Sequence, residues 1–333
     1  MNTTVPTSVR AMANPMPAVV TAARRNVWTL GLIGILALLF VVTKIIQPTY
    51  GPRGVQGLAV SVLPLALAAV AQTCAVIARG IDLSVGSMMA LTSVVAATLM
   101  KDQSEGFAVA VVIGVLLLGL VIGGINGTLV VMTRVPDIVV TLAMLFVWAG
   151  SALLVLKTPG GGSAEWLSGL TRGTLIRDWV PKAAVMLILV VSVIWIPIRR
   201  SRLGLSLYAV GSDPMAAYRS GVSVGRTKIL AYMLAGLFSA LGGLTLTAST
   251  GIGTPVPGPY TLMSVAAVVL GGVSLAGGKG GVFGPVVAVV ILSLLRTDMT
   301  FLNVNTNLAT VAQGIILVGV VMVGSLIHMR REN

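Results

Sequence analysis

The chain has 333 residues, of which 56% are hydrophobic and only 9% are charged. Its mean hydropathy of +1.01 exceeds what a soluble core of this size requires, so the composition indicates an integral membrane protein. The formal net charge of +13 comes from basic residues scattered through short loops, which argues for membrane topology and against nucleic-acid binding. The single cysteine, Cys74, excludes a disulfide framework and a thiolate metal site built from this chain.

Ten apolar segments follow one another along the chain. One transmembrane helix needs about 20 apolar residues, so ten leave room for short loops and for no large soluble domain. The first segment, 27–46, is interpreted as a retained helix and not a signal peptide, because it is long and no small-residue cleavage site follows it. The others are expected at about 57–78, 84–100, 107–132, 137–156, 181–198, 229–249, 261–276, 281–295 and 308–327.

Two features predict how these segments pack. The segments 261–276 and 281–295 are short and flank the glycine-rich stretch 277–281, which favours broken or re-entrant helices. Gly119, Gly123 and Gly127 form a ladder on one helix face, which predicts a close approach of two helix backbones. The predicted fold is an all-α, polytopic bundle of about ten transmembrane helices, some of them short or broken.

The distribution of basic residues predicts the topology. With the N-terminus in the cytoplasm, most of the 22 Lys and Arg residues lie on the cytoplasmic side. The longer polar stretches then fall on opposite sides, 157–180 outside and 199–228 inside. We therefore expect cytoplasmic tails at 1–26 and 328–333 and, between them, a single transmembrane domain over 27–327.

The motif GIDLSVGS, Gly80 to Ser87, joins two apolar segments. A buried acid is costly and needs a reason. In one interpretation Asp82 or Ser84 caps the next helix, whose free N–H groups and positive dipole end favour an oxygen acceptor. In the other, the loop lies at the cytoplasmic mouth of a transport path. Both remain open from the residues alone.

The stretch 202–224 predicts a short helix outside the membrane. Asp213 suits an N-cap, Pro214 the first helical position, Ala216 and Ala217 the helix body, and Gly221 the position after its end. Such a helix is either a docking element for a partner protein or an ordinary amphipathic connector. The residues do not decide between the two.

Several polar residues lie inside the apolar segments. Each hydroxyl of a sugar leaving water needs a replacement hydrogen-bond partner, so such a set suits a sugar path. Intramembrane Ser and Thr also bond back to their own helix, which is the structural alternative. The residues are Asn126, Thr133, Thr141, Thr245, Thr247 and Ser249.

Sites for chemistry are not expected in this chain. Gly278-Lys279 is followed by Gly280 and lacks the spacing and Ser/Thr of a phosphate-binding loop, so we expect no ATP site. The one histidine, His328, lies in the basic tail and leaves little basis for metal ligation or a Ser-His-Asp triad. We expect no catalytic residue and no bound cofactor or metal.

Four segments carry a resemblance to a known family: GIDLSVGS, GGINGTLVVMTRVPDIVVTLAML, RLGLSLYAVGSDPMAAYRSGV and AAVVLGGVSLAGGKGGVFG. Over residues 30–327 the chain resembles the ribose-type permeases of bacterial ATP-binding-cassette (ABC) sugar importers. The resemblance implies a type II importer permease in the bacterial inner membrane that pairs with an identical or homologous copy. It also implies a cytoplasmic ATPase that binds ATP and magnesium, and a periplasmic or lipid-anchored sugar-binding protein.

The resemblance also assigns residues. It implies that the family's ATPase-coupling region comprises Gly204, Ala209, Gly211, Asp213, Ala216, Ala217 and Gly221. The expected translocation path comprises Asp82, Ser84, Asn126, Thr133, Thr141, Thr245 and Ser249. The chain departs from the family pattern by Asp213 in place of an asparagine, Thr261 and Met263 in place of an acidic pair, and Arg296 to Asp298 in place of Asn-Gly. These departures affect the expected solute and not the fold.

Several other functions are alternatives to a sugar importer. Related permeases would carry a nucleoside, a polyol, a furanose signal molecule or a branched-chain amino acid. An ion-coupled secondary transporter would need acids on an intramembrane path, and the deep segments are almost free of Asp and Glu. A membrane enzyme would need a nucleophile with a base or a metal cluster, and neither is visible.

Overall fold

The computed structural model describes residues 27–305 except 177 and 257, together with a few separate positions between 307 and 319. The tails 1–26 and 328–333 and most of the expected last segment, 308–327, lie outside the described residues. Across the described part, the chain has helices and two isolated β-bridges but no strand. The helices are α2 (Val27–Ile46), α3 (Pro52–Ile77), α4 (Val85–Met100), α5 (Glu105–Thr133), α6 (Asp137–Val155), α7 (Glu165–Thr171), α8 (Lys182–Arg200), α9 (Arg202–Ser212), α10 (Pro214–Arg219), α11 (Val224–Thr250), α12 (Tyr260–Leu270) and α13 (Phe283–Phe301).

Seven of these helices are long and apolar enough to cross a membrane: α2, α3, α5, α6, α8, α11 and α13. Two shorter apolar helices, α4 and α12, accompany them. The predicted all-α membrane bundle is therefore confirmed, with helix bounds close to those expected for most segments. The expected number of ten spans is not reached within the described residues.

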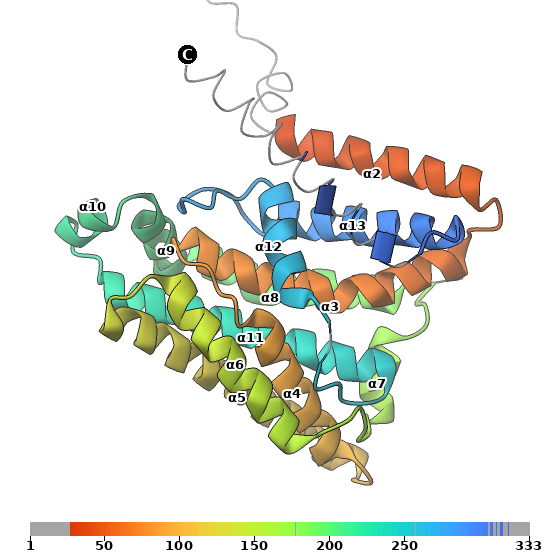
Figure 1. Ribbon diagram of the computed structural model, residues 1–333, viewed down its shortest axis with the longest axis horizontal. Coiled ribbons are helices and arrows are strands. Elements are labelled where there is room, and N and C mark those ends of the chain that lie inside the picture. Colours follow the sequence, from red (N-terminus) through yellow and green to blue (C-terminus); the bar gives the residue numbers. More distant parts are fainter. Residues whose placement is uncertain are drawn as a thin grey trace, which may run out of the picture.

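Helices α3 and α11 form the centre of the bundle (Figure 1). In their most apolar windows 89% of α3 and 78% of α11 is buried, against 11% for α2 and 17% for α6. Helices α4 and α5 pack on α11, while α12 and α13 pack on α3, and α2 covers α13. Large hydrophobic side chains on α2, α5, α6 and α8 are exposed, as a lipid-facing surface requires.

The glycine ladder of α5 faces α11. A Cβ atom added at Gly119 would collide with Ala240 and the Gly236 carbonyl, and one at Gly123 would collide with the Tyr232 carbonyl. The backbones thus approach as closely as the sequence predicts, because no side chain on the ladder separates them.

The short helices α4 and α12 begin at the same place inside the bundle. The Gly86 N–H at the start of α4 donates to Thr261 Oγ1 at the start of α12, at 3.0 Å. From there α4 runs toward Lys101, next to Gly162, and α12 runs toward Gly271, which packs on the start of α13. The predicted short segment 261–276 is thus an 11-residue helix.

The prediction for the neighbouring segment, 281–295, is wrong. Helix α13 has 19 residues and continues through Arg296 and Asp298 to Phe301. The predicted segment stops just before Arg296, but Arg296 lines a cavity and Asp298 lies close to Thr43 of α2, so the helix carries both.

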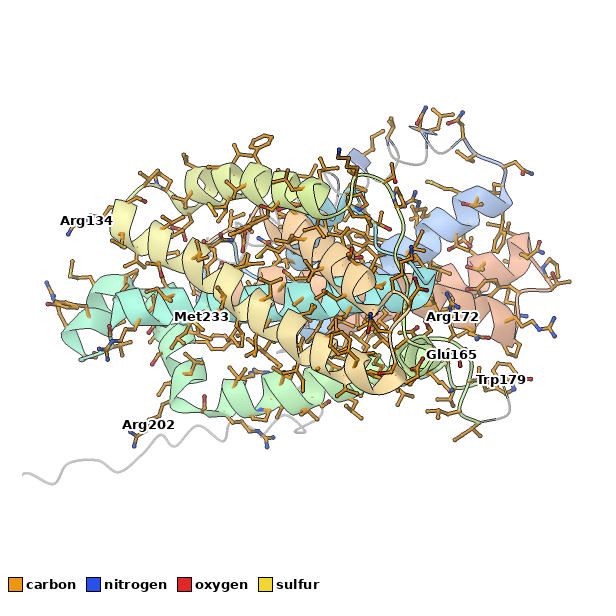
Figure 2. The ribbon with its side chains drawn as sticks, turned by 90° about the horizontal axis from the view of Figure 1, so that it is seen from below. Arg134, Glu165, Arg172, Trp179, Arg202 and Met233 are labelled. Carbon is orange, nitrogen blue, oxygen red and sulfur yellow. The ribbon has the colours of Figure 1, made fainter. Side chains whose placement is uncertain are left out.

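The two longer polar stretches lie at opposite ends of the bundle. Figure 2 shows Arg134 and Arg202 at one end, and Glu165, Arg172 and Trp179 at the other. We call these the α10 end and the α7 end, after the short helices that they carry. The stretches predicted on opposite membrane sides, 157–180 and 199–228, thus belong to opposite ends.

Candidate functional site: a cavity and two clusters

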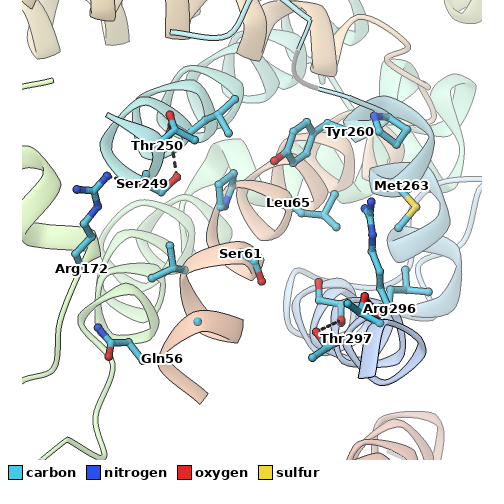
Figure 3. A pocket seen from close by; sticks show the side chains of 18 of the residues that line it. Gln56, Ser61, Leu65, Arg172, Ser249, Thr250, Tyr260, Met263, Arg296 and Thr297 are labelled. Carbon is cyan, nitrogen blue, oxygen red and sulfur yellow. Dashed lines mark hydrogen bonds between the residues drawn. The ribbon is translucent and has the colours of Figure 1, made fainter. Parts of the chain in front are cut away.

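A cavity of about 780 Å³ lies between α3, α11, α12 and α13, toward the α7 end. Tyr260 and Met263, in the first turn of α12, line it, so the cavity reaches the level at which α12 begins. Figure 3 shows Arg172 and Ser249 on one side of it and Met263 and Arg296 on the other. Its lining includes Arg53, Gln56, Ser61, Leu65, Arg172, Ser249, Thr250, Tyr260, Met263, Ser293, Arg296 and Thr297.

A cluster of buried polar groups surrounds the loop between α3 and α4. Asp82 is fully buried. Its Oδ1 accepts from the Ser84 N–H at 2.9 Å and from Ser84 Oγ at 2.6 Å. Asn126 Nδ2 donates to Ser84 Oγ at 2.7 Å, and Trp148 Nε1 donates to Asn126 Oδ1 at 3.0 Å. A chain of hydrogen bonds thus joins the loop to α5 and α6.

Two further side chains hold this loop by its backbone. Thr141 Oγ1 accepts from the Leu83 N–H at 3.1 Å and donates to the Ile81 carbonyl at 3.0 Å. The Gln72 amide lies against the backbone of Asp82, where one orientation of the amide satisfies both of its polar atoms. Ser84 is the N-cap residue of α4, but its side chain makes no capping bond, because it bonds to Asp82 and Asn126 instead. Ser84 therefore occupies the predicted N-cap position of α4, but its side chain does not cap the helix.

An ion pair lies beside this cluster. Lys228 Nζ bonds both oxygens of Asp137, at 2.9 and 3.0 Å, and the Tyr232 hydroxyl donates to Asp137 Oδ2 at 2.9 Å. A Cβ atom at Gly80 would collide with the same carboxylate. This group was not predicted from the sequence. The one indication of it in the sequence is that Asp137 and Lys228 each lie at the start of an apolar segment.

The predicted short helix outside the long helices is α10. Asp213 caps it by accepting from the Met215 and Ala216 N–H groups at 2.8 and 3.0 Å. Pro214 is its first residue, and Gly221, with φ of 83°, follows the C-cap Ser220. The signals for this helix in the sequence are thus confirmed.

Helix α9 joins α10 to the centre of the bundle. A Cβ atom at Gly211 would collide with the Ile77 carbonyl at the end of α3 and with Gly278. That carbonyl accepts from the Gly278 N–H at 3.0 Å, and the Tyr208 hydroxyl donates to the Gly280 carbonyl at 2.8 Å. Burial raises the pKa of Tyr208, which keeps the phenol protonated as a donor. The glycine-rich stretch 277–281 thus packs α9 against α3.

The predicted coupling residues divide by exposure. Gly204 packs on the Arg199 carbonyl, Ala209 is half-buried, and Gly211 and Ala217 are buried. On α10, Ala216 is exposed, and so are two large side chains that the sequence analysis did not single out, Met215 (60%) and Tyr218 (69%). The predicted coupling residues Asp213 and Gly221 are exposed as well, so a partner could contact both ends of α10 and its side that carries Met215, Ala216 and Tyr218.

The structure separates the predicted path residues. Asp82, Ser84, Asn126 and Thr141 meet in the buried cluster. Ser249 lines the cavity, whereas Thr245 is buried and bonds to the Gly242 carbonyl at 2.9 Å. Thr133 is exposed at the end of α5 and bonds to the Leu129 carbonyl at 2.8 Å. Among the described residues, no group of three or more His, Cys, Asp or Glu side chains could hold a metal ion.

Comparison with known proteins identifies the family. The permease components of branched-chain amino acid transport systems match residues 54–321. The chain belongs to this family. The ribose import permease protein RbsC of Escherichia coli K12 is 32% identical over 267 residues, which cover 78% of this chain and 81% of the relative. RbsC of Bacillus subtilis 168 is 31% identical over 287 residues, 85% of this chain and 88% of the relative.

A relative named for a second sugar gives a similar match. The galactose/methyl galactoside import permease protein MglC of Escherichia coli K12 is 31% identical over 277 residues, 77% of this chain and 82% of the relative. No solved structure matches the chain. Together with the apolar spans, this family membership makes the chain an inner-membrane permease.

Proposed function

We propose that this chain is the permease subunit of an ABC importer and carries a monosaccharide, or a derivative of one, across the inner membrane. The observation that supports this most strongly is the match over most of the chain to permeases named for ribose and galactose import. The family description names branched-chain amino acids, but the relatives named above are sugar permeases, which favours sugar.

In this proposal the α10 end faces the cytoplasm, and both termini lie there. The basic residues at this end, among them Arg134, Arg199, Arg200, Arg202 and Arg219, fit the positive-inside rule. The cavity toward the α7 end then faces the binding protein that delivers the solute. ATP and magnesium bind to the partner ATPase, and a second permease, identical or homologous, completes the transporter.

The ATPase docks on α10. Met215, Ala216 and Tyr218 offer it an exposed and largely apolar surface. A displacement of α10 by the ATPase moves α9 and, with it, the end of α3. The reason is that Gly211 brings the backbone of α9 into contact with the Ile77 carbonyl of α3. Ile77 ends α3 five positions before Asp82, so movement of α9 reaches the buried cluster through the short loop that follows α3.

The first experiment is purification of the tagged protein in mild detergent from its native host, with mass spectrometry of the bound proteins. We expect an ABC ATPase to co-purify, and ATP-dependent solute uptake in proteoliposomes that contain the complex. A permease recovered alone, together with uptake that does not depend on ATP, would contradict the proposal and favour a secondary transporter.

A single substitution tests the docking surface. Ala216→Glu places a charge on the exposed side of α10, and we expect it to reduce ATPase co-purification at least tenfold while the protein still inserts. Ala216→Ser, which stays small, is the matched control and is expected to retain the ATPase. Ala217 is unsuitable for this test because it is buried against the bundle. Equal ATPase recovery with Ala216→Glu would exclude α10 as the docking helix.

A further inference from the structure

The cavity between α3, α11, α12 and α13 is lined by three arginines. Arg53 comes from α3, Arg172 follows α7, and Arg296 comes from α13. No Asp or Glu of the described residues lines this cavity. Figure 3 shows Arg172 and Arg296 on opposite sides of the α3 segment that carries Ser61 and Leu65.

The acids of the chain lie elsewhere. Asp82 bonds to Ser84, Asp137 to Lys228, and Asp213 caps α10, while Asp298 lies close to Thr43 of α2. The Lys228–Asp137 contact is the one ion pair formed by the residues that the structure describes. The acids near the α7 end are Asp102, Glu105, Glu165 and Asp178, and Glu332 lies outside the described residues.

Among the described residues, neither Arg172 nor Arg296 forms an ion pair, and no carboxylate lines their cavity. Arg53 also lines a smaller neighbouring cavity of about 440 Å³, whose lining includes Asp178. Arg172 donates from one terminal nitrogen to the Ser249 carbonyl at 2.8 Å, which fixes its position without neutralising it. The Arg172 and Arg296 side chains are both exposed, and neither is paired with a described carboxylate.

Unbalanced guanidinium groups in a cavity attract a particular kind of ligand. A planar guanidinium matches the oxygens of a carboxylate or a phosphate and binds them by two parallel hydrogen bonds. Low-dielectric walls concentrate the field of such charges within a cleft. A neutral sugar gains little from this field, whereas an anion gains from each arginine.

We propose that the solute of this cavity is a monosaccharide derivative that carries an oxyanion, either a sugar acid or a sugar phosphate. The proposal rests on the importer function proposed above and specifies its substrate class. Arg296 and Arg172 bind the oxyanion, and the polar side chains of Ser61, Gln56 and Thr297 face the sugar hydroxyls.

The cavity charge can be measured without knowing the solute. Ser61→Cys places a thiol on the exposed part of the α3 wall, while native Cys74 is buried and stays unreactive. The thiol is labelled with a negatively and a positively charged methanethiosulfonate, and each rate is divided by that of glutathione with the same reagent. We expect the normalised ratio, negative over positive, to be at least ten.

Two further variants locate the origin of that ratio. Replacing Arg172 and Arg296 by Met in the Ser61→Cys protein should lower the ratio at least fivefold. Lys101→Gln removes a positive charge at the same end of the bundle but outside the cavity, and should change the ratio less than twofold. A ratio near one in the Ser61→Cys protein, or no response to loss of the two arginines, overturns the proposal.

Transport of defined probes then distinguishes the two oxyanions. The complete importer is reconstituted in proteoliposomes and given labelled ribose, ribonate or ribose 5-phosphate. We expect uptake of ribonate or ribose 5-phosphate over ribose, at least a tenfold loss of uptake with Arg296→Met, and partial retention with Arg296→Lys. Uptake of ribose alone, at the same rate in Arg296→Met, overturns the proposal.

The remaining outcomes are also decisive. If none of the three probes is carried, the labelling ratio alone decides whether the cavity selects anions. Uptake that does not require ATP contradicts the importer function. The labelling ratio still tests in that case whether the cavity selects anions.

Discussion

The two ends of the bundle use polar residues in opposite ways. Toward the α10 end, Asp82, Ser84 and Asn126 are buried and bonded to one another, and glycines bring the backbones of α3, α9 and the 277–281 stretch into contact. Toward the α7 end, Arg172 and Arg296 line an open cavity that contains no described carboxylate. Polar residues that bond to one another fix the structure, whereas arginines that form no ion pair with a described carboxylate can bind an anionic ligand.

This difference predicts that equal chemical changes have unequal effects at the two ends. Substitution of a hydrogen-bonded or closely packed residue in the closed α10 end should destabilise the fold, because its partner loses a contact. A substitution of a cavity residue should change transport with little effect on stability. The three variants below are ordered from the largest expected loss of stability to the smallest.

The largest loss is expected for Gly211→Ala. Its methyl group would occupy the position of the Ile77 carbonyl, so α9 must move away from α3. Overpacking of this kind costs about 1–3 kcal/mol, and here we expect the upper part of that range because the neighbour is rigid backbone. The measurement is the unfolding temperature in detergent, together with the amount of ATPase bound.

Gly150→Ala is the matched control for this variant. A Cβ atom at Gly150 of α6 has no neighbour within 4 Å. The same change there should be neutral or stabilise the helix by up to about 1 kcal/mol, because alanine is the better helix former. Equal losses of stability in the two variants would show that backbone contact at Gly211 does not set the rigidity of the α10 end.

An intermediate loss is expected for Asn126→Leu. The variant keeps the number and branching of the side-chain heavy atoms, although it is somewhat larger, and removes the donor to Ser84 Oγ and the acceptor for Trp148 Nε1. A buried polar group left without its partner costs about 1–3 kcal/mol in proteins generally, and measured pairs within membranes average lower. We therefore expect a loss of about 1–2 kcal/mol, measured by unfolding in detergent mixtures. An unchanged unfolding free energy would mean that the cluster does not stabilise the loop.

Local patterns in the sequence predicted the elements, because hydropathy and capping depend on neighbouring residues. The caps at Asp213 and Gly221 and most helix bounds follow from such patterns. The end of α13 was mispredicted, since a charged residue that lines a cavity cannot be told from one in a loop by sequence alone. Long-range contacts were not predictable for the same reason: Asp137 meets Lys228 across 91 residues.

The candidate site shows the same limit. Asp82, Ser84, Asn126 and Thr141 were selected one by one as polar residues in apolar surroundings, and the fold brings these four together. Thr133 met the same criterion and is exposed at a helix end. The arginines of the cavity were not selected as site residues. Arg296 was noted only as a departure from the family pattern, and Arg53 and Arg172 lie in polar stretches where no local pattern marks them.

The smallest loss is expected for Ser249→Ala at the cavity. The Ser249 hydroxyl bonds back to the Leu246 carbonyl of its own helix at 3.0 Å, so its removal leaves no distant group unpaired. Alanine also favours the helix, and the net change in unfolding free energy should stay within about 0.5 kcal/mol. The uptake rate should fall if the hydroxyl also faces the solute, since Ser249 lines the cavity beside Arg172. Loss of stability equal to that of Asn126→Leu would remove the distinction between the two ends. An unchanged stability combined with slower uptake would show that the open end is built for the solute and not for the fold.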